Sequence, residues 1–421
     1  MRPRITLLLV VTGVLALLPS CRSENTYVGT FETLWKKVDE TYFDTTFGGL
    51  DWKSAHDRYL PRIAAARRDE DFYGLVNTML WELNVSHANL VPPGMMARRE
   101  PLVCAEGGVG IDVRVLGGAT VVTSVKPGSP AGQADLRAGY LIQAVDGVPV
   151  EQIVQEAQTV VRPPNNSRNR VAVISKAILG RIYGPPGTEV SIAYSDEGGK
   201  KTEKRMVRTK RDGVALGPRG ALYLAVEFET RRLGDELGYV RLNTLQPPLV
   251  TRVSSAIRSM GHLRGLVLDL RGNAGGEIEG MPGLFLRERT LLYLRRSRNG
   301  ETKVFVDPAR DVCECPLVVL VDELSGSAGE LFAACLQATG RAVVAGGRSP
   351  GAVTESDMTV LRSGAIFMYP VARLATPDGT VLEGHGVVPN IEVALDREML
   401  LKGIDSQLQA AVGYLGKVPP R

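Results

Sequence analysis

The stretch that decides the fold is "LVVLVDELSGSAGELFAACLQATGRAVVAG", which runs from Leu317 to Gly346. Five apolar residues at its start predict a buried strand, and the small-residue run after Ser327 predicts a helix. Two serines, Ser325 and Ser327, lie between them, where the start of a helix leaves backbone N–H groups free. This layout suits a nucleophilic serine, which needs a neighbouring base to take its proton at neutral pH.

The sequence after these serines offers little in the way of a base. No lysine follows before Lys402, and no histidine follows before His385. The question of which residue activates a serine is therefore open at this point.

The chain around this stretch alternates strands and helices from residue 237 onward, which is typical of an α/β core. Within it, "LVLDLRGNAGGE" (266–277) ends a predicted buried strand in a glycine turn. Gly275 and Gly276 would free the backbone to point N–H groups at a ligand. A lone Gly-Gly pair favours a simple tight turn; beside a serine turn it indicates half of an oxyanion hole.

Two further parts precede this core. Residues 27–90 carry apolar residues at helical spacing and predict a small helical bundle. Residues 101–212 consist of short alternating runs separated by glycine turns, with a helix candidate at 167–182.

Composition excludes some functions. The chain of 421 residues is 44% hydrophobic and 23% charged, as in ordinary globular proteins, and its net charge is +4. This charge is too weak to indicate nucleic acid, and no zinc-type pattern of cysteines and histidines is present. We therefore expect no nucleic-acid partner and no zinc site.

The N-terminus resembles an export signal. Arg2 and Arg4 precede an apolar run at 5–18, which is shorter than the ~20 residues of a membrane span. Residues 1–20 followed by Cys21 are similar to a bacterial lipoprotein signal, which implies lipidation of Cys21; the alternative is an ordinary signal peptide. The expected location is the bacterial cell envelope, at the outer membrane facing the periplasm, with a lipid anchor as the membrane contact.

Four cysteines remain after Cys21. They allow three complete disulfide pairings in an exported protein, and the sequence does not choose among them. They are Cys104, Cys313, Cys315 and Cys335.

The strand-rich part resembles a PDZ domain. "GGVGIDV" is similar to the loop that binds a peptide's terminal carboxylate, and "VKPGSPAGQADLRAGYLIQAVDGVPV" matches the run that follows it. Such domains add a peptide as a strand beside an exposed sheet edge. The resemblance places peptide binding at Gly108, Val109, Gly110 and Ile111.

The core resembles the S41 family of C-terminal processing and tail-specific peptidases. The motifs that carry this resemblance occur in the family's order: "GYVRL", "GLVLDLRGNAGG", the serine stretch and "GVVPNIEV". The implied fold is α/β, with a helical N-terminal part at 27–95, a β-rich PDZ domain with a helical insert at 101–212, and a crotonase-like ββα peptidase core at 220–415.

The resemblance also implies roles for the serine stretch. Alignment on Glu330 places the nucleophile at Ser327, with oxyanion amides at Ala328 and Gly275. In the commonest branch a lysine in "TFGKG" is the base, but Ala352 occupies its place here. A serine–lysine dyad of the usual kind is therefore excluded.

A second, tricorn-like branch of the family uses a histidine as the base. "LNVSHANL" supplies Ser86 and His87 at the expected place, and "LEGHGVVPN" supplies Glu383. The implied tetrad has Ser327 as nucleophile, His87 as general base, and Ser86 with Glu383 as the orienting pair. His385 is a weaker candidate for the base. A histidine base predicts activity that rises with an apparent pKa of ~6–7.

Together these features predict an exported serine endopeptidase. It would recognise exposed C-terminal tails of proteins or peptides through the PDZ domain and form an acyl-enzyme on Ser327. That chemistry needs no metal and no cofactor, so we expect neither. The alternative is a catalytically inactive S41-like binding protein for a hydrophobic ligand or a peptide. A PDZ-centred scaffold is a third reading, but it leaves the serine turn and Ser86–His87 unexplained.

Overall fold

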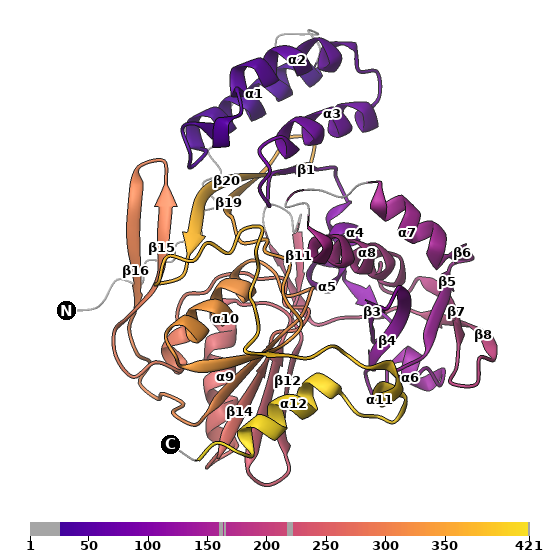
Figure 1. The fold of residues 1–421 in the computed structure, drawn as a ribbon. Helices are drawn as coiled ribbons and strands as arrows, with labels where there is room; N and C mark the ends of the chain where they lie inside the picture. The colour runs from indigo at the N-terminus through magenta and orange to yellow at the C-terminus, as the bar shows by residue number, and fades with distance from the viewer. Residues whose placement is uncertain (1–25, 160–162, 164–165, 217–221, 420–421) are drawn as a thin grey trace.

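The structure is a computed structural model that describes residues 26–159, 163, 166–216 and 222–419 (Figure 1). The expected signal segment at 1–20 and Cys21 lie outside the described residues. Among the residues described, no helix is long and apolar enough to cross a membrane.

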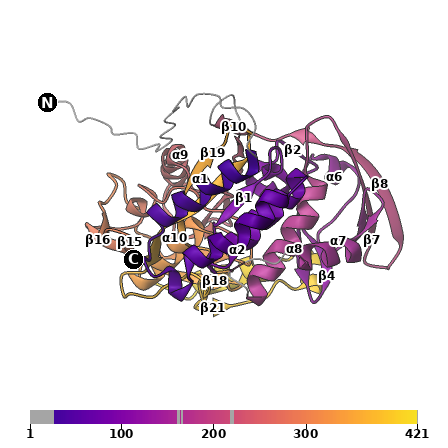
Figure 2. The ribbon, with the colours of Figure 1, turned by 90° about the horizontal axis from the view of Figure 1, so that it is seen from above.

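The N-terminal part is a helical layer. Helices α1 (Thr26–Thr41) and α2 (Trp52–Ala65) lie side by side at the top of the molecule, and α3 (Asp69–Trp81) packs against α2 (Figures 1 and 2). Asp51 begins α2 by accepting a hydrogen bond from Ser54 N–H at 2.8 Å. Most of the apolar stripe expected from the sequence is buried between these helices, namely Phe31, Leu34, Val38, Phe72, Val76, Met79 and Leu80. Trp35 and Leu75, which the same spacing includes, are only partly buried.

A short strand attaches this helical layer to the core. Strand β1 (Asn89–Val91) pairs antiparallel with β20 (Ile366–Ala375). Strand β20 also pairs with β15 (Thr290–Ser297), which forms a hairpin with β16 (Gly300–Val306). Strand β19 (Glu355–Val360) pairs with the opposite edge of β20. The residues just before β1 are thereby held against the core.

The core is a six-stranded sheet with mostly parallel strands. Its first pair is antiparallel and every later pair is parallel, and β14 and β17 are fully buried runs, as expected for the centre of an α/β sheet. In spatial order the strands are β12 (Phe228–Leu233), β13 (Leu237–Leu242), β14 (Gly265–Asp269), β17 (Leu317–Val321), β18 (Ala342–Gly346) and β21 (Ile391–Glu392). The helices of this part are α9 (Pro247–Ser259), α10 (Ala328–Ala338) and α12 (Ser406–Leu415).

The middle part is a six-stranded antiparallel sheet with two long helices. Helix α8 (Ser167–Ile182) has the bounds expected for the helical insert, and α7 (Val150–Gln158) packs against it. The sheet order is β3 (Ile111–Leu116), β4 (Ala119–Val125), β5 (Leu141–Val145), β7 (Glu189–Ser195) and β8 (Lys201–Val207), with β6 (Val148–Pro149) beside β5. Strand β3 is therefore at an edge of this sheet.

The remaining elements are short and lie within or between the three parts. They include η1 (Phe47–Gly49), α4 (Met96–Arg99), α5 (Pro101–Cys104), β2 (Gly107–Gly108), α6 (Pro130–Gln133), β9 (Thr209–Lys210), β10 (Gly213–Leu216), β11 (Leu222–Ala225), η3 (Pro282–Leu284) and α11 (Arg397–Leu401).

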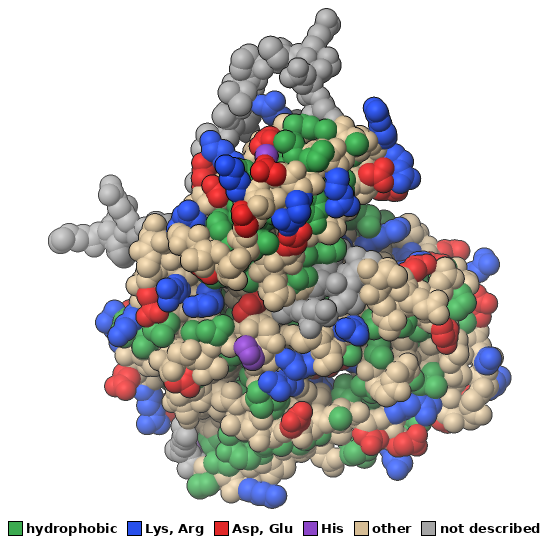
Figure 3. All heavy atoms as spheres, turned by 45° about the horizontal axis from the view of Figure 1, so that its top comes forward, with side chains coloured by type: hydrophobic (Ala, Val, Ile, Leu, Met, Phe, Trp, Pro, Cys, Tyr) green, Lys and Arg blue, Asp and Glu red, His purple; other side chains and the backbone are tan. Residues whose placement is uncertain are grey.

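On the face seen in Figure 3, acidic and basic side chains are interspersed over the helical layer at the top. The architecture is thus mixed α/β with a helical N-terminus, as the sequence predicts.

Candidate active site

The serine turn joins β17 to α10. Ser327 is the residue before the first turn of α10 and has φ 55° and ψ −125°. A positive φ is uncommon for a residue other than glycine and costs of order 1–3 kcal/mol where it persists. A strained strand-to-helix turn of this kind presents a nucleophilic hydroxyl at the end of a sheet.

The two serines of the turn have different environments. Ser325 is 0% exposed; its Oγ donates to the Leu270 carbonyl at 2.7 Å and accepts from Asp322 N–H at 2.9 Å. Ser327 is partly exposed and lines the large cavity described below. Ser325 therefore holds the turn together, while Ser327 presents its side chain to the cavity.

The predicted glycine turn lies directly against Ser327. A Cβ added to Gly275, whose φ is +95°, would lie 2.6 Å from Ser327 Cβ, so only glycine fits there. Gly275 N–H donates to Asn273 Oδ1 at 2.9 Å, and Gly326 N–H donates to the Asn273 carbonyl at 2.8 Å. The Gly275 amide already has a partner, and its oxyanion role stays a prediction, as does that of Ala328 at the first position of α10.

Glu330 organises the other side of the serine turn. This carboxylate is 0% exposed and accepts from Ser349 Oγ at 2.6 Å, Gly351 N–H at 2.7 Å and Ala352 N–H at 2.9 Å. Ser327 N–H is shared between the Ala352 carbonyl at 2.9 Å and Glu330 Oε2 at 3.2 Å. Burial raises the pKa of Glu330 to about 7, although the hydrogen bonds from Ser349, Gly351 and Ala352 oppose this.

Ser86, His87 and Glu383 form one hydrogen-bonded chain. Ser86 Oγ lies 2.8 Å from His87 Nδ1 and 2.9 Å from Glu383 Oε2, while Ser86 N–H donates to Glu383 Oε1 at 2.6 Å. An ionised carboxylate only accepts, so the single Ser86 proton goes to Glu383 and His87 Nδ1–H donates to Ser86 Oγ. That assignment leaves the lone pair on His87 Nε2 available to act as a base.

His87 is electrostatically suited to the neutral form. Burial lowers the pKa of His87, and the Glu383 carboxylate opposes part of that shift. The competing histidine, His385, is exposed; its Nδ1 lies 3.0 Å from the Glu383 carbonyl, and it is absent from the residues lining the cavity.

The segment that replaces the lysine motif connects the two halves of the site. Val353 N–H and Thr354 N–H donate to Glu383 Oε2 at 2.7 and 2.8 Å. The neighbouring Ala352 carbonyl accepts from Ser327 N–H, as described above. The backbone of this segment therefore links Ser327 to Glu383, which is bonded to Ser86 and through it to His87.

One cavity of about 3500 Å³ includes both halves of the site. It is lined by His87 and Ser327, but no hydrogen bond joins these two side chains in the structure as described. The positive charge of Lys176 lowers the pKa of His87 further. The Lys176 Nζ atom itself lies 2.8 Å from Glu100 Oε2. The volume exceeds the ~300–1,000 Å³ of small-molecule pockets, so it is of a size for a polypeptide segment.

The predicted carboxylate-binding loop opens on the same cavity. Gly108, Gly110 and Ile111 line it, and Val109 is fully buried beside them. The carbonyls of Val109 and Gly110 accept from other parts of the same domain at 3.0 and 2.8 Å, which fixes the loop from its carbonyl side. At the start of β3, the Ile111 carbonyl accepts from Tyr183 Oη at 3.2 Å.

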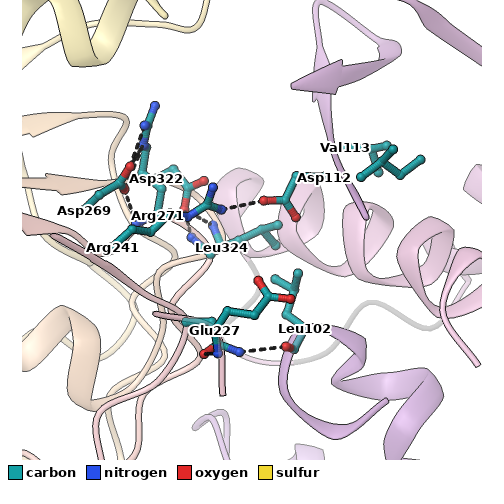
Figure 4. Close-up of polar contacts among 12 residues, drawn as sticks. Leu102, Asp112, Val113, Glu227, Arg241, Asp269, Arg271, Asp322 and Leu324 are labelled. Carbon is teal, nitrogen blue, oxygen red and sulfur yellow. Dashed lines mark hydrogen bonds and ion pairs between the residues drawn. The ribbon is translucent and has the colours of Figure 1, made fainter. Parts of the chain in front are cut away.

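Ion pairs connect this domain to the core, and the pair of Arg114 with Asp322 reaches the serine turn. Arg114 on β3 donates through Nε to Asp322 Oδ2 at 2.8 Å, and both side chains are nearly inaccessible. Asp322 Oδ1 also accepts from Gly272 N–H at 2.9 Å, so one carboxylate contacts both the PDZ-like strand and the glycine turn. A second pair, Arg241 with Asp112, lies alongside (Figure 4).

Comparison with known families identifies the three parts. The model of peptidase family S41 matches residues 236–393, the PDZ domain model matches residues 121–174, and the tricorn protease C1 domain model matches residues 23–81. Residues 236–393 belong to peptidase family S41. The S41 core contains the serine turn, and the tricorn-type segment ends just before Ser86 and His87.

Similar proteins agree with this membership. A carboxyl-terminal-processing protease of Synechocystis sp. is 26% identical and covers 90% of this chain and 85% of its own length. Tricorn protease homolog 1 of Streptomyces coelicolor is also 26% identical, covering 91% of this chain but 34% of its own. The photosystem II D1 C-terminal processing protease structure has a TM-score of 0.56 at 25% identity, covering 90% of this chain and 97% of its own.

Two residues of the S41 core had no role in the sequence analysis. Asn273 holds the glycine turn and Asp322 holds the serine turn, and both are almost completely buried. A buried asparagine inside "RGNAGG" and an acidic residue directly after a strand were the available signals. Their partners lie far away in sequence, so their roles became visible only in the fold.

The described residues contain no group of three or more histidine, cysteine or acidic side chains placed to hold a metal ion. The four described cysteines are free thiols.

Proposed function

We propose that this S41 protein is a serine endopeptidase that hydrolyses peptide bonds through an acyl-enzyme on Ser327, with His87 as general base. The observation that carries the proposal is the chain Glu383–Ser86–His87 on a cavity that also exposes Ser327. The missing lysine is then explained, because the base comes from the segment that follows the helical layer.

In the first step His87 Nε2 takes the proton of Ser327 Oγ while Oγ bonds to the carbonyl carbon of the substrate. The positive imidazolium is stabilised by the Ser86 hydroxyl, which is itself held by Glu383. His87 and Ser327 must approach within hydrogen-bond reach for this transfer. Such bonds are often long in a free enzyme and shorten when substrate binds.

The negative charge that develops on the substrate oxygen requires N–H donors beside Ser327. We assign Ala328 N–H, at the start of α10, to this role. Gly275 N–H is the second assigned donor, and it must turn from Asn273 Oδ1 to the substrate oxygen to act. The tetrahedral intermediate then collapses, His87 returns its proton to the leaving amine, and the C-terminal fragment departs. A water molecule, deprotonated by His87, hydrolyses the remaining ester and regenerates Ser327.

Substrate selection is assigned to the PDZ domain. Its loop lines the cavity shared with the site, and relatives are named as carboxyl-terminal-processing proteases. Two peptides that differ only in a C-terminal carboxylate or amide test this assignment. We expect a KM about 10- to 100-fold higher for the amide, because a charge-assisted hydrogen bond is lost. Equal KM values would contradict tail recognition.

We also propose the bacterial cell envelope as the location, with a lipid on Cys21 as the anchor at the outer membrane, facing the periplasm. The support is the sequence of residues 1–21. Expression of the full chain and of Cys21→Ser, followed by membrane fractionation, is the test. Release of the variant alone into the soluble fraction is expected, and equal release of both would refute the anchor.

The decisive experiment is labelling with a fluorophosphonate, which reacts with an activated serine. Wild-type protein should be labelled, whereas Ser327→Ala and His87→Ala should not. The matched controls are His385→Ala and Lys176→Met, which should retain labelling because neither residue belongs to the chain of hydrogen bonds. No labelling of folded wild-type protein would favour the second candidate, an inactive S41-like binding protein for a hydrophobic ligand or a peptide. That candidate is consistent with the absence of a His87–Ser327 hydrogen bond and with the large cavity.

A further inference from the structure

Two thiols lie side by side on the segment between β16 and β17. The Sγ atoms of Cys313 and Cys315 are 3.4 Å apart. The other described cysteines, Cys104 and Cys335, are buried free thiols in apolar surroundings. The structure therefore singles out one pair where the sequence allowed three complete pairings.

The backbone around this pair is held in place. Arg341 Nη2 donates to the carbonyls of Cys313 and Cys315 at 2.7 and 2.9 Å, and its Nε donates to the Phe285 carbonyl at 2.6 Å. Cys313 N–H donates to the Leu284 carbonyl at 2.7 Å. Because the backbone at both cysteines is fixed from one side, the two sulfur atoms are kept near each other.

The surroundings of the pair favour a thiolate. A hydrogen bond from the Cys315 thiol lowers the pKa of Cys313, and the positive charge of Arg341 acts in the same direction. By contrast, burial raises the pKa of Cys104 to about 12 and also raises the pKa of Cys335. The thiolate is the reactive form of cysteine, and Cys315 is partly exposed, so small reagents can reach the pair.

We propose that Cys313 and Cys315 are a redox-active dithiol that a low-molecular-weight disulfide oxidises to an intrachain disulfide. The inference goes beyond the proposed peptidase function and does not depend on it. A ring closed over so short a segment removes little entropy from the unfolded chain. The bond is therefore suited to exchange and contributes little to stability.

The reaction proceeds in two exchanges. A thiolate of the pair attacks one sulfur of oxidised glutathione, forms a mixed disulfide and releases one glutathione thiolate. The second cysteine of the pair loses its proton and attacks the mixed disulfide, which releases the other glutathione. Two protein thiols are thereby oxidised, and one glutathione disulfide is reduced to two thiols.

The chain provides a direct readout, because Glu314 lies between the two cysteines. The folded protein is treated with oxidised glutathione, its remaining thiols are alkylated, and it is digested with trypsin and a glutamyl endopeptidase. Cleavage after Arg310, Glu314 and Glu323 separates 311–314 from 315–323. Mass spectrometry should find these two peptides joined, and reduction should separate them. Alkylation of both cysteines, or a separate glutathione on each, would overturn the proposal.

Two variants sharpen the test. Cys315→Ser removes the second thiol, so Cys313 should retain glutathione as a stable mixed disulfide; a variant that acquires none would count against the proposal. Cys104→Ala is the matched control and should still give the joined peptides. A wild-type bond to Cys104 or Cys335 in place of the 313–315 bond would also overturn it.

Discussion

Ser86 Oγ donates a hydrogen bond to Glu383 Oε2 at 2.9 Å although the two residues are 297 positions apart. The bond joins the end of the helical N-terminal part to the segment between β20 and β21 of the S41 core. Glu383 also accepts from Val353 and Thr354, so its carboxylate is fixed by the protein before any substrate arrives. A preorganised acceptor of this kind can hold a histidine in one tautomer throughout a reaction.

The first prediction concerns pH. The base acts in its neutral form, and burial lowers the pKa of His87. We therefore expect kcat/KM to rise with pH with an apparent pKa below ~6.5, the ordinary value of histidine. The residue type alone predicts an apparent pKa of ~6–7. The measurement is a pH profile with a peptide substrate. A limb found only at alkaline pH would assign the base to a lysine.

Glu383→Gln should change the same profile. The carboxylate raises the pKa of His87, so its removal should move the limb to still lower pH. The rate at the plateau should also fall by up to about 10⁴-fold, because the orienting group is lost. Glu392→Gln, on an exposed strand end, is the control and should leave both quantities unchanged. An unchanged limb in the Glu383 variant would argue against the relay.

Ser86→Ala should reduce kcat by about 10- to 100-fold. The variant removes the acceptor of His87 Nδ1–H and the donor to Glu383, and a buried polar group left without its partner costs about 1–3 kcal/mol. KM should change little, since Ser86 is not assigned to substrate binding. Steady-state kinetics separate the two quantities. A variant with a raised KM and normal kcat would place Ser86 in substrate binding instead.

Ser327→Gly and Ser327→Ala should both be inactive but differ in stability. Ser327 has a positive φ, which glycine adopts without strain and alanine does not. The glycine variant should be more stable than the alanine variant by about 1–3 kcal/mol. Thermal unfolding of the two variants measures this difference. Equal midpoints would show that the turn is not strained in solution.

Glu330 should make stability depend on pH. Its pKa of about 7 in the folded protein lies above the ordinary 4.5, so between those values the folded chain keeps a proton that the unfolded chain has lost. The contribution of Glu330 to the free energy of unfolding therefore falls as pH rises through this window, by at most about 3 kcal/mol. Glu330→Gln should remove this slope. Unfolding curves at several pH values compare the variant with wild type, and identical slopes would contradict the prediction.

Arg114 and Asp322 should be strongly coupled. Arg114→Met leaves the Asp322 carboxylate buried without its cation, and such a loss typically costs about 3–5 kcal/mol. In the double variant with Asp322→Asn the uncompensated charge is absent, so the combined loss should be smaller than the sum of the single losses by about 1–3 kcal/mol. The measurement is a double-mutant cycle on the free energy of unfolding. Additive losses would show that the two domains are not coupled through this pair.

Much of this architecture was predictable from local patterns. The buried run at 317–321 and the helix at 167–182 depend on residue spacing, and both occur where the sequence places them. Long-range partners are different, because periodicity contains no information about contacts between distant segments. The capping of the serine turn by Glu330, and its anchoring to Arg114 of the PDZ part through Asp322, are examples.

The sequence by itself determined the residue types of the chemistry: a serine at a strand-to-helix turn, a Ser–His pair after a helix, a glutamate before "GHGVVPN", and alanine where the common branch has lysine. Only the tertiary structure decided which of these meet. It brought Glu383 to Ser86, buried Ser325 while leaving Ser327 accessible, and placed Cys313 beside Cys315. The reason is physical: side-chain type is local, whereas proximity, burial and the resulting pKa values arise when separate strands and helices pack around one core.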